Sequence, residues 1–226
     1  MNYGIITARG GSKSIKKKNL SLLDGKPLLY YTITEALKSD LDEIYLSSDD
    51  DEIIKYASQF EINIIRRPIH LASDEAKSID VIKHVISELN SKDDNFCLLQ
   101  PTSPLRNCFH INEAMKLYQS DTSLVKSLVS VVQLDHNYNP DSLMCLSENG
   151  YLLNNNSNNN IYRRQDKPIY FARNGAAIYI FNSKDVQEKL LNGNILKFEM
   201  EKLSSIDIDT HEDLKLANIF MSYLKE

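Results

Sequence analysis

The 226-residue sequence lacks the features that define several protein classes. Its three cysteines, Cys97, Cys108 and Cys145, form neither a CxxC pair nor an even set, so they predict neither a zinc site nor a disulfide framework. No stretch approaches the roughly 20 apolar residues of a membrane span. Met1 leads into Tyr3–Thr7 without the basic and apolar regions of a signal peptide. We therefore expect a soluble protein of the cytoplasm that does not act at a membrane.

An excess of positive charge is also missing. The formal net charge is −5, which argues against general nucleic-acid binding because a phosphate backbone requires a clustered positive field. An anionic small molecule is not excluded, since a locally basic site can lie on an acidic protein. The length and the hydrophobic share of 42% fit a chain with a substantial core. We expect one domain over residues 1–226.

Short apolar runs alternate with helical periodicity along the chain. Runs rich in Ile, Leu, Val and Tyr predict strands at Tyr3–Thr7, Glu43–Ser47, Ile62–Arg66, Phe96–Gln100, Leu124–Val132, Ala176–Phe181 and Ile195–Glu201. Apolar residues at helical spacing predict helices at Pro27–Lys38, Asp51–Phe60, Ser78–Leu89, His110–Gln119, Ser183–Leu191 and His211–Leu224. This alternation predicts an α/β fold with a mainly parallel, doubly wound sheet.

The alternation fails between His136 and Phe171. The segment opens with Asn139-Pro140, where the residue before proline disfavours a continuing helix. We interpret residues 136–171, called the excursion below, as a departure from the main sheet.

A basic loop that contains two glycines follows the first predicted strand. Ligands of parallel α/β proteins bind at the carboxyl ends of strands, and glycines let the backbone approach a phosphate closely. Arg9, Lys13 and Lys18 add positive charge there. The loop matches neither GxxxxGKS/T nor GxGxxG. Its charge alone is equally consistent with an ordinary solvated surface.

Polar and basic side chains later in the chain are candidates for an acidic substrate. Gln100 and Ser103 follow an apolar strand in a turn stiffened by two prolines; a purely rigid turn is the alternative. Arg163, Arg164 and Arg173 carry guanidinium groups that match a carboxylate bidentately. Surface salt bridges are the alternative role for each arginine.

A pair of aspartates precedes the last predicted helix. If this segment is extended, Asp207 and Asp209 point to the same side, and no lysine or arginine between Lys202 and Lys215 neutralises them locally. Oxygen ligands of this kind suit Mg²⁺. Helix capping by Asp209 or Thr210 is the alternative. Both roles can hold together: capping is predicted for Thr210, and the role of the aspartate pair stays open.

In their order along the chain, these motifs resemble the acylneuraminate cytidylyltransferases. The resemblance rests on Ala8–Lys13, Lys18-Asn19, Arg67-Pro68, Leu71–Asp74, Leu99–Arg106, Arg164–Asp166, Asn174–Ala176 and Ser205–Thr210. It implies a nucleotide-diphospho-sugar transferase fold, CTP as donor, Mg²⁺ as cofactor, and a homodimer in which each excursion reaches over the partner's site. The implied reaction moves CMP from CTP to the anomeric hydroxyl of a nine-carbon acidic sugar and releases pyrophosphate.

The resemblance also implies a role for individual residues. The residues that it assigns to CTP are Arg9, Ser12, Lys13, Asn19 and Arg67. It makes Lys18 and Asp209 catalytic and Asp207 and Asp209 the metal ligands, and it assigns Gln100, Ser103, Arg163, Arg164 and Arg173 to the sugar acid.

Three positions depart from the family pattern. Ser14 and Lys16 stand where glycine and proline are common, and Arg173 stands one place later than the family's arginine. These differences favour a bacterial relative of sialic acid such as legionaminic acid. An eight-carbon acid such as Kdo, or an inactive nucleotide-binding sensor, are the alternatives.

Overall fold

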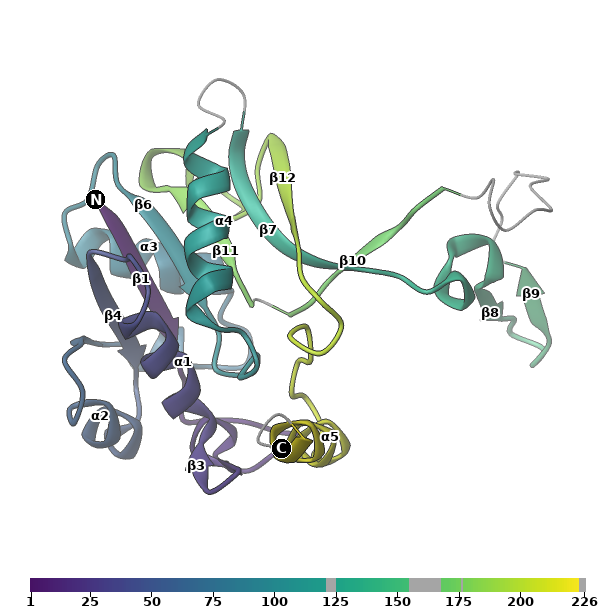
Figure 1. Cartoon of the computed structure of the whole chain (residues 1–226), viewed down its shortest axis with the longest axis horizontal. Helices are drawn as coiled ribbons and strands as arrows, with labels where there is room; N and C mark the ends of the chain where they lie inside the picture. Colours follow the sequence, from purple (N-terminus) through teal and green to yellow (C-terminus); the bar gives the residue numbers. More distant parts are fainter. Residues whose placement is uncertain (121–124, 155–167, 176, 224–226) are drawn as a thin grey trace.

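A mixed, mainly parallel sheet forms the centre of the protein (Figure 1). The computed structural model describes residues 1–120, 125–154, 168–175 and 177–223. The strand order is β10-β7-β11-β6-β1-β4-β5, with β12 beside β7. These strands are β1 (Asn2–Thr7), β4 (Glu43–Ser48), β5 (Asn63–Arg66), β6 (Asn95–Leu99), β7 (Val125–Gln133), β10 (Phe171–Arg173), β11 (Tyr179–Asn182) and β12 (Asn194–Glu199).

The direction of the strands decides which loops meet. Strand β1 pairs in parallel with β4 and β6, and β4 pairs in parallel with β5. Strand β11 is antiparallel to β6 and β7, β10 is antiparallel to β7, and β12 is parallel to β7. The carboxyl ends of β1, β4, β5 and β6 therefore lie at one edge of the sheet.

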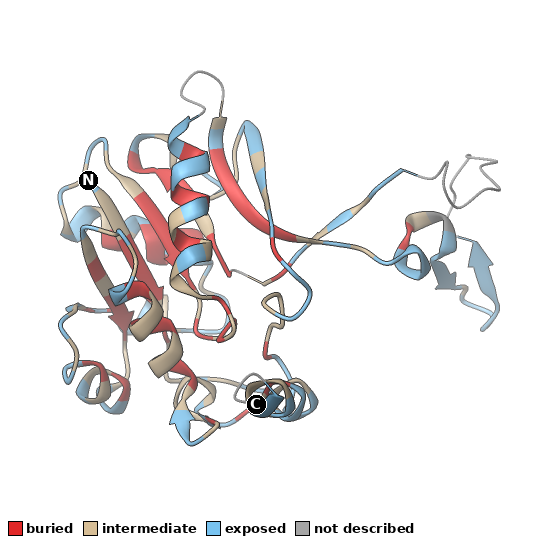
Figure 2. Ribbon diagram, viewed as in Figure 1, coloured by how far each residue is buried: buried red, intermediate tan, exposed pale blue. Residues whose placement is uncertain are grey.

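Helices cover both faces of this sheet. They are α1 (Leu28–Leu37), α2 (Asp51–Ala57), α3 (Ser78–Glu88), α4 (Cys108–Ser120) and α5 (His211–Tyr223). Ile6 of β1 packs in one apolar cluster with residues of α1, α2 and α4, whereas its neighbour Ile5 packs in another with Ile82 of α3. Side chains of a strand alternate between faces, and Figure 2 shows the buried residues gathered between sheet and helices. The doubly wound arrangement predicted from the sequence is confirmed.

The helix predicted at Ser183–Leu191 is wrong. Only Ser183–Asp185 forms a turn of 3₁₀ helix. The carbonyls of Asp185 and Lys189 accept hydrogen bonds from the side chain of Asn192 at 3.2 and 2.6 Å, so a polar side chain satisfies backbone groups that a helix would have paired. Val186 and Leu190 still pack on the sheet, which explains the helix-like apolar spacing.

The excursion projects away from the sheet domain (Figure 1). Its described part contains the 3₁₀ turns His136–Tyr138 and Pro140–Ser142 and an antiparallel hairpin of β8 (Met144–Leu146) and β9 (Leu152–Asn154). The sequence did not predict this hairpin. The remaining short elements are a second hairpin of β2 (Leu22–Leu23) and β3 (Lys26–Pro27), and the 3₁₀ turns Lys18–Leu20 and Ile69–Leu71.

None of the helices in the described part of the chain is both long and apolar enough to cross a membrane.

Candidate active site

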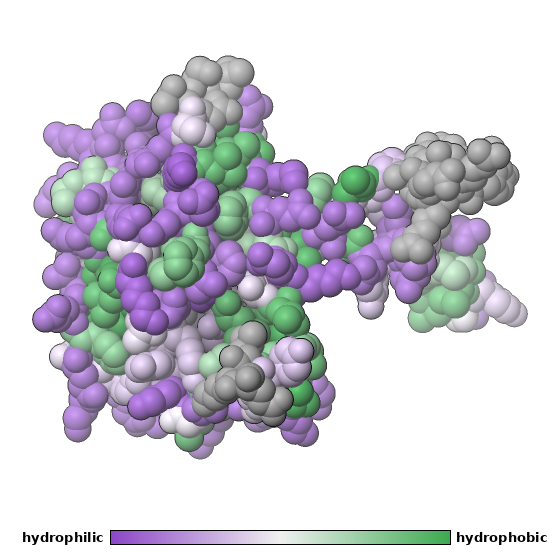
Figure 3. Space-filling view, viewed as in Figure 1, coloured by the Kyte–Doolittle hydropathy of each residue, from purple (hydrophilic) through white to green (hydrophobic). Residues whose placement is uncertain are grey.

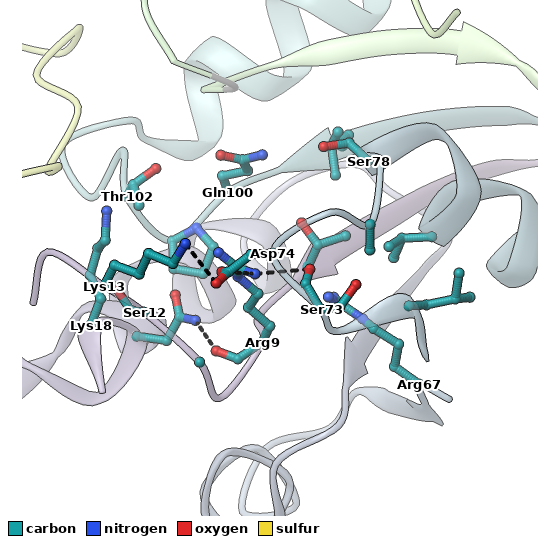
Figure 4. Close-up of a pocket in the computed structure, with 18 of the residues that line it drawn as sticks. Arg9, Ser12, Lys13, Lys18, Arg67, Ser73, Asp74, Ser78, Gln100 and Thr102 are labelled. Carbon is teal, nitrogen blue, oxygen red and sulfur yellow. Dashed lines mark hydrogen bonds and ion pairs between the residues drawn. The ribbon is translucent and has the colours of Figure 1, made fainter. Parts of the chain in front are cut away.

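A cleft of about 420 Å³ lies at the edge of the sheet where the parallel strands end. Its walls come from the loops after β1, β5 and β6, and Figure 4 shows their polar side chains facing one another across it. The lining includes Arg9, Ser12, Lys13, Lys18, Asn19, Arg67 and Gln100. The fold thus brings together the residues that the sequence analysis drew from three separate motifs.

The loop after β1 is fixed by hydrogen bonds at its start. The side-chain amide of Asn19 donates to the carbonyl of Arg9 at 2.9 Å, and the backbone N–H of Gly10 donates to Asp49 Oδ1 at 3.1 Å. A Cβ atom on Gly10 would fall 2.5 Å from Asp50 Oδ2, so only glycine allows this approach to the N-terminus of α2. Asn19 therefore shapes the loop from within, in addition to lining the cleft.

Two cations of this loop converge on one carboxylate. Arg9 Nη1 lies 2.9 Å from Asp74 Oδ1, and Lys13 Nζ lies 2.9 Å from Asp74 Oδ2 (Figure 4). Arg9 Nη1 also donates to the carbonyl of Ser73 at 3.0 Å. These contacts join the loop after β1 to the segment after β5.

A buried cation forms another part of the cleft. Arg67 is only 5% exposed; its Nε donates to Ser47 Oγ at 3.2 Å and its Nη2 to the Ser47 carbonyl at 2.8 Å. Burial lowers the pKa of Arg67 to about 10, with Asp49 opposing and Arg9 adding to that effect. At neutral pH the guanidinium stays charged, so the cleft retains a fixed positive group.

The aspartate pair lies beside the same loop because an apolar residue between the two is buried. Ile208 is fully buried in a cluster with Ile15 of the loop after β1 and Ala217 of α5. Its backbone N–H donates to the carbonyl of Thr102 at 2.8 Å. This anchor places Asp209 beside Lys18 and Asp207 beside Thr102, both of which line the cleft, whereas neither aspartate itself lines either cavity.

The two aspartates have different environments. Burial raises the pKa of Asp207; a hydrogen bond from Thr102 opposes this shift and the charge of Asp209 adds to it. In the described part of the chain no group hydrogen-bonds to Asp207 Oδ1, which is buried. Asp209 is 72% exposed, and Lys18 Nζ lies 2.9 Å from its Oδ1 and 3.0 Å from the Ile208 carbonyl. The sequence showed no lysine or arginine near the pair, but Lys18, which is distant in the sequence, neutralises Asp209 in the fold.

Thr210 caps helix α5. Its Oγ1 accepts from the backbone N–H of Asp213 at 3.2 Å, and Asp213 Oδ2 accepts from the backbone N–H of Thr210 at 2.7 Å. This reciprocal arrangement is a capping box. The capping role predicted for Thr210 is confirmed, and the carboxylate of Asp209 is not needed for it.

A second cavity, of about 970 Å³, adjoins the first. Ser78, Leu98 and Gln100 line both. Arg173 and Tyr179 line the second, where burial raises the pKa of Tyr179 and the charge of Arg173 opposes that shift. Gln100 thus stands between a basic cleft and a second cavity that carries a guanidinium group.

The segment between β10 and β11 lies against Asp207. β10 and β11 pair with successive parts of β7, and Asn174 and Gly175 leave the ladder between them. Asn174 is held by Ser130 Oγ at 2.7 Å and Ser205 Oγ at 2.9 Å. Gly175 has φ +69°, and a Cβ atom there would fall 2.5 Å from Asp207 Cγ. The backbone therefore touches the carboxylate that the sequence analysis assigned to metal.

Some residues proposed from the sequence do not gather here. Ser103 is fully buried and lines neither cavity, so its placement supports a role inside the turn and not a contact with substrate. Arg163 and Arg164 lie outside the described residues.

Other lining residues were missed. Asp74 stood in a quoted motif without a role, and Glu188–Leu191 lines the second cavity from a stretch that the sequence analysis read as a helix.

Comparisons with known proteins identify relatives of this chain. An N-acylneuraminate cytidylyltransferase from Streptococcus agalactiae is 34% identical over 227 residues, covering 97% of this chain and 53% of that protein. A pseudaminic acid cytidylyltransferase from Campylobacter jejuni is 32% identical over 225 residues, covering 96% and 95%. The chain thus spans about half the length of the N-acylneuraminate relatives and nearly all of the Campylobacter one.

A solved structure shows the same fold. It is the CMP:2-keto-3-deoxy-manno-octonic acid synthetase complexed with CTP, with a TM-score of 0.73 at 17% identity and coverage of 99% of both chains. The family model described as cytidylyltransferase matches residues 3–225. The chain belongs to the cytidylyltransferase family.

Proposed function

We propose that this chain transfers CMP from CTP to the anomeric hydroxyl of a nine-carbon nonulosonic acid of the sialic or legionaminic type, with release of pyrophosphate. The observation that carries the proposal is the pair of adjoining cavities, one basic and one holding Arg173, with Gln100 between them. The relatives that act on N-acylneuraminate and pseudaminic acid support the same substrate class.

The first cavity accommodates the nucleotide. All five residues that the resemblance assigned to CTP line it: Arg9, Ser12, Lys13, Asn19 and Arg67. Three of them are cations that offset the charge of a triphosphate. Gln100 and Arg173 then face the sugar acid, whose carboxylate pairs with the guanidinium of Arg173.

Asp207 and Asp209 fit a divalent cation. Asp207 Oδ1 is buried and no described residue pairs with it, which is costly unless a ligand completes it. Among the described residues, no group of three or more His, Cys, Asp or Glu side chains is arranged to hold a metal ion. The protein would therefore supply two carboxylate ligands, and oxygen atoms of the substrates would supply the others. Mg²⁺ held by Asp207 and Asp209 would offset phosphate charge and would lower the pKa of the sugar hydroxyl.

The protein contributes chiefly position and charge. The sugar hydroxyl attacks the α-phosphorus of CTP in line with the leaving pyrophosphate, and no covalent intermediate with the protein is required. Lys18, now paired with Asp209, lies where its ammonium group reaches a phosphate that enters the cleft. Arg9 and Lys13 stabilise the negative charge that accumulates on pyrophosphate.

A pyrophosphate-release assay across the common nucleoside triphosphates and several sugar acids tests this function. We expect release with CTP and nine-carbon acids and little with other nucleotides. Faster release with an eight-carbon acid such as Kdo would favour that substrate instead. CTP binding without release in the presence of any acid would identify an inactive sensor.

The excursion supports a homodimer, which is the assembly we propose. Its hairpin and flanks expose Leu143, Met144, Leu146, Tyr151, Leu152 and Leu153, and Figure 3 shows a hydrophobic area at its end. A contiguous exposed apolar surface usually marks an interaction site, and a second copy would cover both hairpins symmetrically.

Light scattering should give twice the chain mass of 25.9 kDa. The Leu146→Asp and Leu152→Asp double variant should give the monomer mass, because charge enters the covered surface. Ile219→Asp, at an equally exposed apolar position on α5, is the matched control and should remain dimeric. A wild-type monomer that is fully active would contradict the dimer.

A further inference from the structure

Asp74 forms ion pairs with Arg9 and Lys13, two of the cations that we propose bind the triphosphate. Each of its carboxylate oxygens contacts a different cation at 2.9 Å, Oδ1 with Arg9 and Oδ2 with Lys13. A phosphate group that bridged the two cations would make the same pair of contacts. The hydrogen bond from Lys13, with a smaller contribution from Arg9, holds the pKa of Asp74 below its usual value. The carboxylate therefore carries a full negative charge at neutral pH.

This arrangement can be displaced with little structural change. The side chains of Arg9, Lys13 and Asp74 are 36%, 80% and 46% exposed, so their ion pairs are weak. Asp74 follows the short turn Ile69–Leu71 and lies on a non-helical segment before α3. Rotation of its side chain into solvent breaks these two pairs and exposes no apolar core.

If Asp74 stayed in place, it would repel the ligand. A phosphate bound to Arg9 and Lys13 would lie within a few ångströms of the carboxylate, and like charges at that distance oppose binding. An anion that uses these two cations must therefore either displace Asp74 or bind against its repulsion. In both cases Asp74 lowers the affinity.

We propose that Asp74 is a specificity-determining residue that competes internally with phosphate groups for Arg9 and Lys13. CTP overcomes the competition through its further contacts in the cleft, including Arg67, whereas inorganic anions that rely on the two cations bind poorly. Pyrophosphate, the product, is one of these anions, so Asp74 promotes its release. This inference rests on the proposed function for the identity of the nucleotide, but not for the competition itself.

Calorimetric titration of wild type and Asp74→Asn with inorganic pyrophosphate tests the competition directly. The variant removes one charge and keeps the side-chain shape. We expect Asp74→Asn to bind pyrophosphate about fivefold to tenfold more tightly at low salt, and the gain to shrink at high salt as screening increases. Equal or weaker binding by the variant would overturn the proposal, because Asp74 would then be holding the cations in place for the ligand.

Glu52→Gln is the matched control. It removes an exposed carboxylate paired with Lys17 of the same loop, and neither residue lines the cleft. We expect its pyrophosphate affinity to stay within about twofold of wild type, since the screened pair is remote from the ligand. An equal gain in this variant would show a general charge effect and would also overturn the proposal.

Turnover separates this inference from the proposed function. CTP turnover by both proteins without a gain in pyrophosphate affinity would reject the competition alone. A gain in affinity without CTP turnover by wild type would reject the proposed function and leave the competition standing.

Discussion

Replacing Asp207 with asparagine is expected to reduce the rate of CMP transfer by about 100-fold or more, because it removes charge stabilisation of the reacting phosphate. Asp207 Oδ1 is buried and makes no hydrogen bond to any residue that the structure describes. Asparagine has nearly the same shape, so the loss would reflect charge. Steady-state kinetics at saturating CTP and Mg²⁺ measure it. Asp209→Asn should also lose most turnover. In this structure the exposed carboxylate of Asp209 forms an ion pair with Lys18.

The same variant should be at least as stable as wild type. Burial is the main cause that raises the pKa of Asp207, which means that the folded protein disfavours the ionised carboxylate. An acid with a raised folded-state pKa binds more protons in the native state, so its ionisation destabilises the fold increasingly as pH rises through that pKa. Without metal, the stability of Asp207→Asn in thermal unfolding should therefore exceed that of wild type increasingly as pH rises, and the two proteins should be equally stable at acid pH.

Asp93→Asn provides a matched control for charge. Asp93 is an exposed carboxylate, paired with Lys184, that precedes β6 at the edge of the sheet away from the cleft. It should retain nearly full activity. If Asp207→Asn keeps comparable activity at saturating Mg²⁺, the assignment of Asp207 to metal is wrong. If Asp207→Asn unfolds, the carboxylate of Asp207 stabilises the fold, even though its Oδ1 has no hydrogen-bond partner among the described residues.

Most of the fold could be predicted from local sequence patterns. The strands around the cleft lie within about two residues of their predicted bounds, because apolar strand runs and amphipathic helices are short-range signals. The segment at Ser183–Leu191 shows the limit of such signals. Its apolar spacing fits a helix, but Asn192 bonds to the carbonyls of Asp185 and Lys189 and Leu190 packs as part of an irregular chain. The spacing of apolar residues alone cannot show that the Asn192 side chain takes the place of helical hydrogen bonds.

The site was predictable as a set of motifs and less so as a set of contacts. Parallel strands bring their carboxyl ends together whatever the loops contain, so the basic loop and Gln100 were expected to meet. The partners of Lys18 and Lys13 were not predictable, since Asp209 and Asp74 come from other loops. Ser103 shows the opposite case: its polar side chain after a strand suggested a contact with substrate, whereas the structure buries it in the turn.

Substituting alanine for Gly175 is expected to lower the rate of CMP transfer by about 100-fold, since a displacement of a reacting group by about 1 Å has effects of that order. A Cβ atom at this position would fall 2.5 Å from Asp207 Cγ and within 2.7 Å of both carboxylate oxygens. Asp207 must therefore move. Lost turnover, measured at saturating substrates, would reflect that displacement.

Backbone strain must be separated from this contact, because Gly175 also has φ +69°. Gly25 has φ +77°, and no atom lies within 4 Å of the position of a Cβ atom there. Gly25→Ala and Gly175→Ala should each lose about 1 kcal/mol of unfolding free energy through the left-handed backbone. Only Gly175→Ala should lose activity and Mg²⁺ affinity in calorimetric titration with CTP. If the two variants have equal activity, the close approach of Gly175 to Asp207 has no role in catalysis.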